Sequence, residues 1–278
     1  MVKEILTVIK GMPASDGAGV KLHRALGQPK LETIDPFLML DEIKSDVPGD
    51  YIAGFPSHPH KGFETLTYLM HGSMEHKDST GGQGLIASGG VQYMTAGRGI
   101  IHSETPKQDN GLLWGFQLWI NLPADQKLIE ASYQDIPKEN IPIIKLSPKD
   151  SQLKLIAGIH PKYDGVGPVV RNDIDLHILD VTTIEDDQII LETLQNHRGF
   201  IYVYKGVAEV NGCNIEAGYI AQLGDGTDLT LNLSQQSGIL IVFAKPIDEP
   251  IVKYGPFVMN TVEEIEQAIR DYQEGKFV

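Results

Sequence analysis

The feature that most limits the fold of this sequence is a succession of short runs rich in β-branched and aromatic residues, separated by Gly, Asp, Asn and Pro. The 29 glycines and 16 prolines are spread along the 278 residues rather than gathered in one segment. Many short strands with turn signals between them are typical of antiparallel sandwiches and barrels. The pattern predicts an all-β protein, and the clearest runs are ETLTYLM (64–70), VQYMT (91–95), FQLWIN (116–121), LKLI (153–156), LHILDV (176–181), QIIL (188–191), FIYVY (200–204), LTLNL (229–233) and ILIVF (239–243).

One segment near the end has helical periodicity instead. Asn260 or Thr261 can cap its N-terminus, acidic residues fill the first turn, and Gly275 follows its end. Apolar residues recur at the spacing of one helical face. We expect a short C-terminal α-helix with Val262, Ile265, Ala268, Ile269 and Tyr272 on one face.

The length allows two domains of roughly 100–150 residues each. Residues 122–150 are richer in Pro, Asp and Lys than their surroundings, and we interpret them as the crossing between two β-domains. The sequence also repeats itself weakly: HKGF (60–63) and HRGF (197–200) each enter a β run that ends in glycine. These features predict a duplicated barrel, with residues 1–132 in an N-terminal domain and 133–278 in a C-terminal domain that includes the helix.

Charge and cysteine content narrow the possible partners. The chain has 23 Lys and Arg against 37 Asp and Glu, a formal net charge of −14. A field of that sign repels phosphate backbones, so we expect no direct nucleic-acid partner. No apolar run approaches the ~18 residues of a membrane span. The single cysteine, Cys213, excludes an intramolecular disulfide, and we expect a cytoplasmic protein.

Two pairs of candidate metal ligands stand out. His58 and His60 are two residues apart, and so are His102 and Glu104. Residues i and i+2 of a strand point to the same face, so each pair projects its two side chains together. The excursion through residues 61–101 can bring the pairs together across a barrel. Imidazoles with a carboxylate suit a borderline divalent ion, and four such ligands on an octahedral ion leave two positions open.

Either pair alone could equally be surface residues or a hydrogen-bonded polar pair in the core. Two pairs beside glycines in a β-rich chain favour the metal site. Glu64 shares the strand parity of His60 and is expected to ligate the ion or to hydrogen-bond a ligand ring. Aligning the internal repeat sets Gln195 against His58, so we expect a metal in the first half only and interpret His197 as a remnant. The remaining histidines are expected to be exposed or hydrogen-bonded: His23, His71, His76, His160 and His177.

Five stretches resemble the pirin family, a branch of the cupin superfamily: DPFLMLDE (35–42), FPSHPHKGFET (55–65), QYMTAGRGIIHSE (92–104), FQLWINLP (116–123) and YGPFVMNTVEEI (254–265). The resemblance covers nearly the whole chain and is most specific in its first half. It implies two jelly-roll-like cupin β-barrels packed face to face, with one metal ion in the N-terminal barrel. The implied ion is most often Fe(II), with Mn, Ni, Cu, Co or Zn as alternatives, and the implied ligands are His58, His60, His102 and Glu104.

Several pirins are quercetinase-like and open flavonols such as quercetin with O2, releasing carbon monoxide. The resemblance therefore implies a quercetin 2,3-dioxygenase-like oxidoreductase that takes a small aromatic substrate. Glu104 would be both ligand and proton acceptor. Candidates for the substrate slot, or else for ordinary barrel core, are Phe55, Met94, Gln117 and Trp119. The competing hypothesis is a non-catalytic iron-binding pirin that acts as a redox-responsive module for a protein partner.

Overall fold

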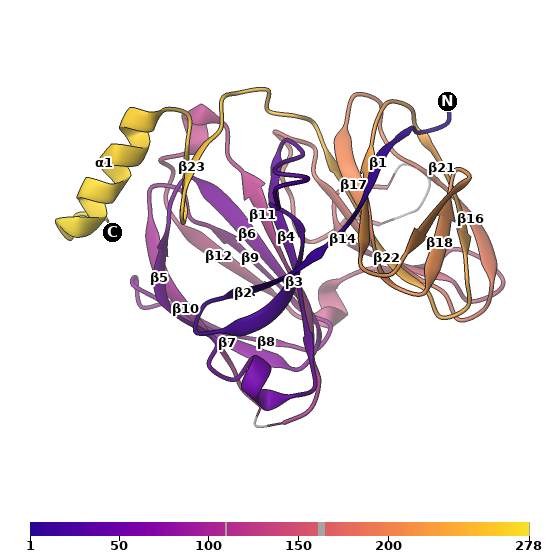
Figure 1. Cartoon of the computed structure of the whole chain (residues 1–278), viewed down its shortest axis with the longest axis horizontal. Coiled ribbons are helices and arrows are strands. Elements are labelled where there is room, and N and C mark those ends of the chain that lie inside the picture. Colours follow the sequence, from indigo (N-terminus) through magenta and orange to yellow (C-terminus); the bar gives the residue numbers. More distant parts are fainter. Residues whose placement is uncertain (109, 161–164, 278) are drawn as a thin grey trace. The chain divides into compact units, whose positions relative to one another are not determined.

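The computed structural model describes residues 1–108, 110–160 and 165–277, which form two compact units (Figure 1). The N-terminal unit comprises Pro13–Arg24, Phe37–Lys138 and Ile247–Val278. The C-terminal unit comprises Met1–Met12, Ala25–Pro36 and Glu139–Pro246. The sequence pattern predicts one boundary, between residues 132 and 133. In the structure the main boundary lies between Lys138 and Glu139. Residues 1–12 and 25–36 belong to the C-terminal unit, and Ile247–Val278 belongs to the N-terminal unit.

Two sheets form the N-terminal unit. The first has the order β12-β9-β6-β11-β4-β3-β2 and the second the order β5-β10-β7-β8. The strands of the first sheet are β2 (Met12–Asp16), β3 (Val20–Leu26), β4 (Phe37–Ser45), β6 (Phe63–His71), β9 (Val91–Thr95), β11 (Leu113–Asn121) and β12 (Ser132–Ile136). Those of the second are β5 (Phe55–His60), β7 (Ser73–Asp78), β8 (Gln83–Ala87) and β10 (Ile100–Pro106).

The C-terminal unit repeats this arrangement, with sheets in the orders β1-β20-β17-β22-β15-β14-β13 and β16-β21-β18-β19. The strands of its larger sheet are β1 (Ile5–Lys10), β13 (Ile143–Lys145), β14 (Gln152–Ala157), β15 (His177–Thr182), β17 (Arg198–Lys205), β20 (Tyr219–Leu223) and β22 (Gly238–Ala244). Those of its smaller sheet are β16 (Asp187–Glu192), β18 (Val207–Val210), β19 (Cys213–Glu216) and β21 (Asp228–Leu233). The predicted all-β architecture is confirmed.

Alternation of apolar and polar residues builds the core of the C-terminal unit. In β21, Leu229, Leu231 and Leu233 are buried while the residues between them are partly exposed. In the neighbouring β16, Ile189 and Leu191 are buried in the same way. Both sets join one apolar cluster with residues of the larger sheet. Each fully buried Leu or Ile contributes about 1.5–3 kcal/mol of hydrophobic free energy, so the two sheets are held face to face by this layer.

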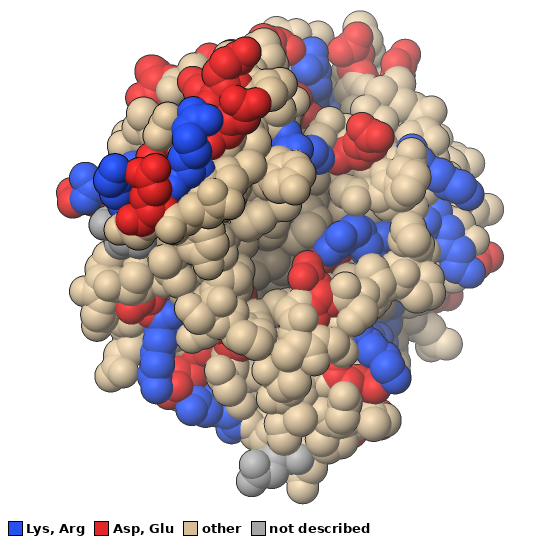
Figure 2. Space-filling view, turned by 60° about the vertical axis from the view of Figure 1, so that its left-hand side comes forward, with Lys and Arg blue, Asp and Glu red and all other residues tan. Residues whose placement is uncertain are grey.

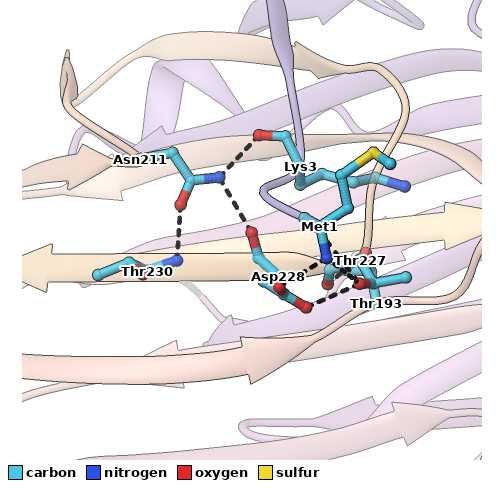
Figure 3. A network of polar contacts seen from close by, with 7 residues as sticks. All are labelled: Met1, Lys3, Thr193, Asn211, Thr227, Asp228 and Thr230. Carbon is cyan, nitrogen blue, oxygen red and sulfur yellow. Dashed lines mark hydrogen bonds and ion pairs between the residues drawn. The ribbon is translucent and has the colours of Figure 1, made fainter.

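The first residues of the chain are bound into the C-terminal unit. Strand β1 pairs antiparallel with β20. Ahead of it, the ammonium group of Met1 lies 2.8 Å from the carboxylate of Asp228. The side-chain amide of Asn211 donates to the carbonyl of Lys3 at 2.7 Å and accepts from the backbone N–H of Thr230 (Figure 3). Residues that open the sequence therefore complete a sheet made mostly of residues from its second half.

The N-terminal unit ends in a hairpin and a helix. The hairpin is β23 (Val252–Tyr254) with β24 (Phe257–Met259), and the helix is α1 (Val262–Gln273). Thr261 caps the helix, and its hydroxyl and the Glu264 carboxylate form a capping box. Ile265 and Ala268 pack on the hairpin and on Phe277. The predicted C-terminal helix is confirmed, with Thr261 as the N-cap. Three single-turn 3₁₀ helices cover Pro48–Asp50, Ala124–Gln126 and Lys138–Asn140.

A buried lysine fixes the turn between β5 and β6. Gly62 has φ +84°, and a Cβ there would lie 2.0 Å from the carbonyl oxygen of Val258, so only glycine fits. The Nζ atom of Lys127 donates to the carbonyls of Gly62 at 2.9 Å and Val258 at 3.0 Å, and to Oδ1 of Asn121 at 2.8 Å. These bonds hold the backbone just beyond His60.

Candidate metal centre

Two neighbouring strands of the smaller sheet carry the predicted ligands. Strands β5 and β10 are antiparallel, and His58 pairs directly with His102 across the ladder. His60 pairs with Ile100, and it projects from the same face of β5 as His58. The register shifts between His102 and Glu104, so β5 carries one extra residue there. The strand pairing thus places three imidazoles on one face.

The three rings converge closely. Their centroids are 4.6 Å apart for His58 and His60, 4.4 Å for His58 and His102, and 4.9 Å for His60 and His102. One ring nitrogen of each lies within 4.8 Å of the other two. His60 and His102 are almost fully buried, and His58 is partly exposed. The group is therefore compact and can be reached from solvent at His58.

The protonation of these rings suits metal binding. Nδ1 of His58 lies 2.8 Å from the carbonyl of Pro56, which can only accept, so Nε2 carries a lone pair toward the group. Burial first, and neighbouring imidazoles second, lower the pKa of His60 well below its ordinary value and that of His102 to about 3. Both rings are therefore neutral at pH 7, the form that coordinates a metal ion.

The distances also fit a shared ion. Nε2 of His58 and Nε2 of His60 are 2.9 Å apart. Two bonds of about 2.1 Å at a right angle separate their donor atoms by about 3 Å, so one cation can bind both nitrogens. Neither nitrogen of His102 has a hydrogen-bond partner within residues 1–108, 110–160 and 165–277. A single proton between His58 and His60 forms a hydrogen bond with those two rings only. A cation can bind one nitrogen of each of the three rings.

Glu104 lies outside this compact group of three. Its carboxylate is buried, and it accepts from the hydroxyl of Thr67 at 3.4 Å and from the amide of Gln117 at 3.4 and 3.5 Å. Burial raises the pKa of Glu104, and the nearby His58 opposes that shift. The side chain is thus a buried carboxylate with a raised proton affinity.

A small cavity borders Glu104. Its polar lining residues beside Glu104 are Thr67 and Gln117, and the rest of its lining is apolar and includes Phe55 and Phe116. Its volume of about 10 Å³ is the space of one water molecule. Phe55 and Gln117, two candidates for the substrate slot, therefore lie beside Glu104, around a space that admits a water-sized molecule.

The other two slot candidates lie elsewhere in the N-terminal unit. Trp119 packs its ring against His60 at 5.2 Å and against Phe63 at 4.3 Å. Met94 is fully buried in an apolar cluster with Ala96 and Ile100. Trp119 thus borders the imidazole group, while Met94 contributes to the core.

Glu64 is held by two hydroxyl groups. The hydroxyl of Tyr93 donates a short hydrogen bond to one carboxylate oxygen, and Oγ1 of Thr95 donates to the other at 2.8 Å. Glu64 is buried and does not belong to the compact group of potential ligands.

Sequence reasoning gave too little weight to His76. This residue pairs with Glu104 across the β7–β10 ladder, and its side chain is buried. Its Nε2 lies 3.1 Å from the carboxylate of Asp135, and its ring stacks on Tyr133 at 4.8 Å. The expected hydrogen bond is present, but the position beside Glu104 depends on strand register, which the sequence spacing does not reveal.

Comparison with known proteins also separates the chain into two parts, but groups the hairpin and helix at its end with the second part. The family model described as Pirin matches residues 19–120, and the Pirin C-terminal cupin domain matches residues 178–278. A Pseudomonas aeruginosa protein named "Putative quercetin 2,3-dioxygenase" is 45% identical over 98% of this chain and 97% of its own. Pirin of Homo sapiens is 35% identical over 99% of this chain and 93% of its own.

A solved structure matches the whole fold. The quercetin 2,3-dioxygenase of Acinetobacter baumannii superimposes with a TM-score of 0.93 at 34% sequence identity, and the match covers 100% of this chain and 99% of that one. The two β-units described above therefore correspond to two cupin domains.

Proposed function

The chain belongs to the pirin family, and from that premise we propose that it is a metal-dependent dioxygenase that opens flavonols such as quercetin with O2 and releases carbon monoxide. The observation that carries this proposal is the convergence of His58, His60 and His102, with two Nε2 atoms 2.9 Å apart. The names of the relatives in Pseudomonas and Acinetobacter support the same reaction.

In this proposal His58, His60, His102 and Glu104 hold one divalent ion. Three neutral imidazoles with one carboxylate suit Fe(II) and the other borderline ions Mn, Co, Ni, Cu and Zn. Fe(II) is our first choice because of the family resemblance. The bound ion supplies positive charge beside the substrate oxygens and lowers the pKa of a coordinated hydroxyl.

Glu104 is the proposed proton acceptor for the flavonol hydroxyl. A carboxylate that binds a metal ion is a weak base, so coordination of the substrate must also lower the pKa of its hydroxyl. The hydroxyl of Thr67 and the amide of Gln117 hold the carboxylate in place. Both oxygen atoms of O2 enter the opened product as carbon monoxide leaves, so the reaction needs no external reductant.

Substrate size limits where the flavonol can bind. The cavity beside Glu104 admits only a water-sized molecule, so a flavonol must lie outside it. The partly exposed His58 gives the substrate access to the imidazole group, and the ring of Trp119 beside His60 offers an aromatic face. We propose that the small cavity takes water or O2 while the flavonol lies on the solvent side of His58.

Metal-loaded protein tests this directly. Apoprotein is loaded anaerobically with one ion at a time, exposed to air and quercetin, and followed by loss of the flavonol absorbance and by carbon monoxide release. We expect turnover with Fe(II) and equal amounts of quercetin consumed and carbon monoxide formed. Tight metal binding without turnover for any ion contradicts the dioxygenase.

That contradicting result would favour a second function, a non-catalytic iron-binding pirin that responds to redox state and binds a protein partner. Two observations favour it: the small cavity and the similarity to human pirin. The net charge of −14 favours a partner with a basic patch. Lys and Arg are interspersed with Asp and Glu over the face shown in Figure 2.

Within the described residues, no helix is long and apolar enough to cross a membrane.

A further inference from the structure

A second cluster of potential ligands lies in the C-terminal unit, where the sequence predicts no metal. Asp175, His177 and His197 each offer one ligand atom within 4.8 Å of the other two. Nε2 of His177 lies 3.2 Å from Oδ1 of Asp175, and Nε2 of His197 lies 3.2 Å from Oδ2. Both imidazoles are buried, and the Asp175 side chain is 39% exposed. The carboxylate thus lies between two rings, with one side open to solvent.

The hydrogen bonds of His197 require a positive charge between its ring and Asp175. Nδ1 of His197 lies 3.0 Å from the carbonyl oxygen of Gln195, which can only accept. Nδ1 therefore carries the proton, and in the neutral ring Nε2 presents a lone pair to the carboxylate of Asp175. Two acceptors that face each other at 3.2 Å need a positive charge between them, either a second proton on His197 or a bound cation.

His58 in the first unit is held in the same way. Its Nδ1 donates to the carbonyl of Pro56, two residues before it, just as His197 donates to Gln195. A backbone acceptor on the far nitrogen is the usual support of a metal-binding imidazole, because it fixes the tautomer and the ring orientation. This shared geometry does not follow the sequence repeat, which aligns His197 with His60 and Gln195 with His58.

The surroundings fix both rings. His177 stacks on the buried ring of Phe243 at 4.6 Å with an interplanar angle of 7°, and His197 packs against the same ring edge-on at 5.9 Å. Nζ of Lys3 donates to the carbonyl of His197 at 3.3 Å and holds that backbone. Nδ1 of His177 has no hydrogen-bond partner among the described residues. Without an ion this atom is an unpaired acceptor, and with an ion on Nε2 it carries the proton and becomes an unpaired donor.

The distances suit a small divalent ion. Two ligand bonds of about 2.0–2.1 Å at a near-tetrahedral angle separate their donor atoms by about 3.3 Å, close to the 3.2 Å of both nitrogen–oxygen contacts. Two imidazoles and one carboxylate form a ligand set typical of borderline metals, with a further position left for water. The exposed side of Asp175 gives an ion a path from solvent.

We propose that Asp175, His177 and His197 form a second divalent-cation site, with Zn²⁺ as its best-suited ion. The site is separate from the His58–His60–His102 group and does not depend on the dioxygenase reaction. Lys245 competes with an ion for Asp175, because its Nζ lies 4.0 Å from Oδ2 of that residue. The Lys245 side chain is 56% exposed, so it can move into solvent when an ion binds.

Zinc uptake in a protein without the first site tests the proposal. The background variant carries His58→Ala and His102→Ala, which leave one imidazole of the first group. Equilibrium dialysis against Zn²⁺ followed by elemental analysis should give one zinc per chain in this variant. Adding Asp175→Asn should weaken that binding at least about tenfold, because even a residue that only supports a ligand contributes 10–100-fold. Asn fits well here, since Asp175 has φ +48° and Asn tolerates this region.

Further variants separate the site from adventitious binding and from misfolding. His197→Gln in the same background should weaken zinc binding as Asp175→Asn does, whereas the exposed His71→Ala should leave it unchanged. Lys245→Gln should tighten it about fivefold, because removing a unit charge at 4 Å in water changes the energy by about 1 kcal/mol. Zn²⁺ should also raise the thermal unfolding midpoint of the background variant and not that of its Asp175→Asn form.

The proposal fails if the background variant takes up no zinc, since His197 would then be satisfied by a second proton alone. It also fails if Asp175→Asn and His197→Gln bind zinc as tightly as the background, which would assign the ion to other residues. A weaker affinity in Lys245→Gln would contradict a cation at this position.

Discussion

His58 and His102 face each other directly across the ladder of β5 and β10, with their ring centroids 4.4 Å apart. A cross-strand pair of this kind is fixed by backbone hydrogen bonds on both strands, so the rings are in position before any ion arrives. Pre-organised ligands lose little conformational freedom on binding, which strengthens the proposed site.

Replacing His102 with Ala should abolish flavonol turnover and lower the metal content by one ion per chain, the ion of the His58–His60–His102 group. The proposed site has four protein ligands, and the loss of one buried imidazole leaves the ion with too few donors. Elemental analysis after reconstitution and the decay of quercetin absorbance measure the two effects. His71→Ala, which removes an exposed imidazole outside both clusters, is the control. A His102→Ala protein with a stoichiometric ion and full activity would disprove the proposed ligand set.

Changing Glu104 to Gln should lower kcat at least about 100-fold. The amide keeps the size of the carboxylate but cannot accept a proton, and general-base catalysis typically contributes 10²–10⁴-fold. Steady-state kinetics gives kcat for both proteins, and each value is divided by the measured metal content. This separates the loss of the base from weaker metal binding. If kcat per metal stays within a few-fold of the unmodified protein, another group must accept the proton.

Substitution of Glu64 by Gln tests a different role. Both carboxylate oxygens already accept hydroxyl hydrogen bonds, from Tyr93 and Thr95, so we expect metal content to stay the same. Elemental analysis compares the metal content of Glu64→Gln with that of His60→Gln, which removes a proposed ligand. Equal losses in the two variants would show that Glu64 is a ligand.

Lys127 should give the stability of the N-terminal unit a distinct pH dependence. Burial lowers its pKa from 10.5 to about 8, against the attraction of Glu249 and Glu264. Between these pH values the unfolded chain keeps a proton that the folded chain releases, so stability from this residue rises with pH and is smallest below pH 8. Urea unfolding at a series of pH values should show this slope in the unmodified protein and lose it in Lys127→Met.

The same substitution should cost at least about 2 kcal/mol at pH 7, because buried carbonyls of Gly62 and Val258 lose their donor. The exposed Lys30→Met is the control and should change stability little. An unchanged unfolding midpoint in Lys127→Met would mean that water replaces the ammonium group without loss.

Local rules were enough to predict the fold class and the shared strand face of His58 and His60. Alternating burial fits the strand run 229–233, and the i, i+2 rule places His58 and His60 on one face. The meeting of these rings with His102 needed a long-range strand pairing, which spacing suggests but does not specify. The resemblance to known pirins supplied the rest.

Long-range contacts account for what the sequence could not predict. Asp175 lies in a turn with φ +48°, so strand parity says nothing about where its side chain points. It meets His197 across 22 positions, and the repeat alignment compared His197 only with His60. Strand β1 was assigned to the first domain by its place in the chain, but a strand pairs with any complementary edge, here that of β20.

The pairing of β1 with β20 can form only late in synthesis, because β1 leaves the ribosome long before β20. Met1 and Asp228, joined by an ion pair, are 227 positions apart, so the ribosome releases the opening strand long before its partner exists. Until then the edge of that strand is unpaired and open to association with other chains. A nascent chain of this protein therefore has a period of exposure that lasts until translation has passed β20.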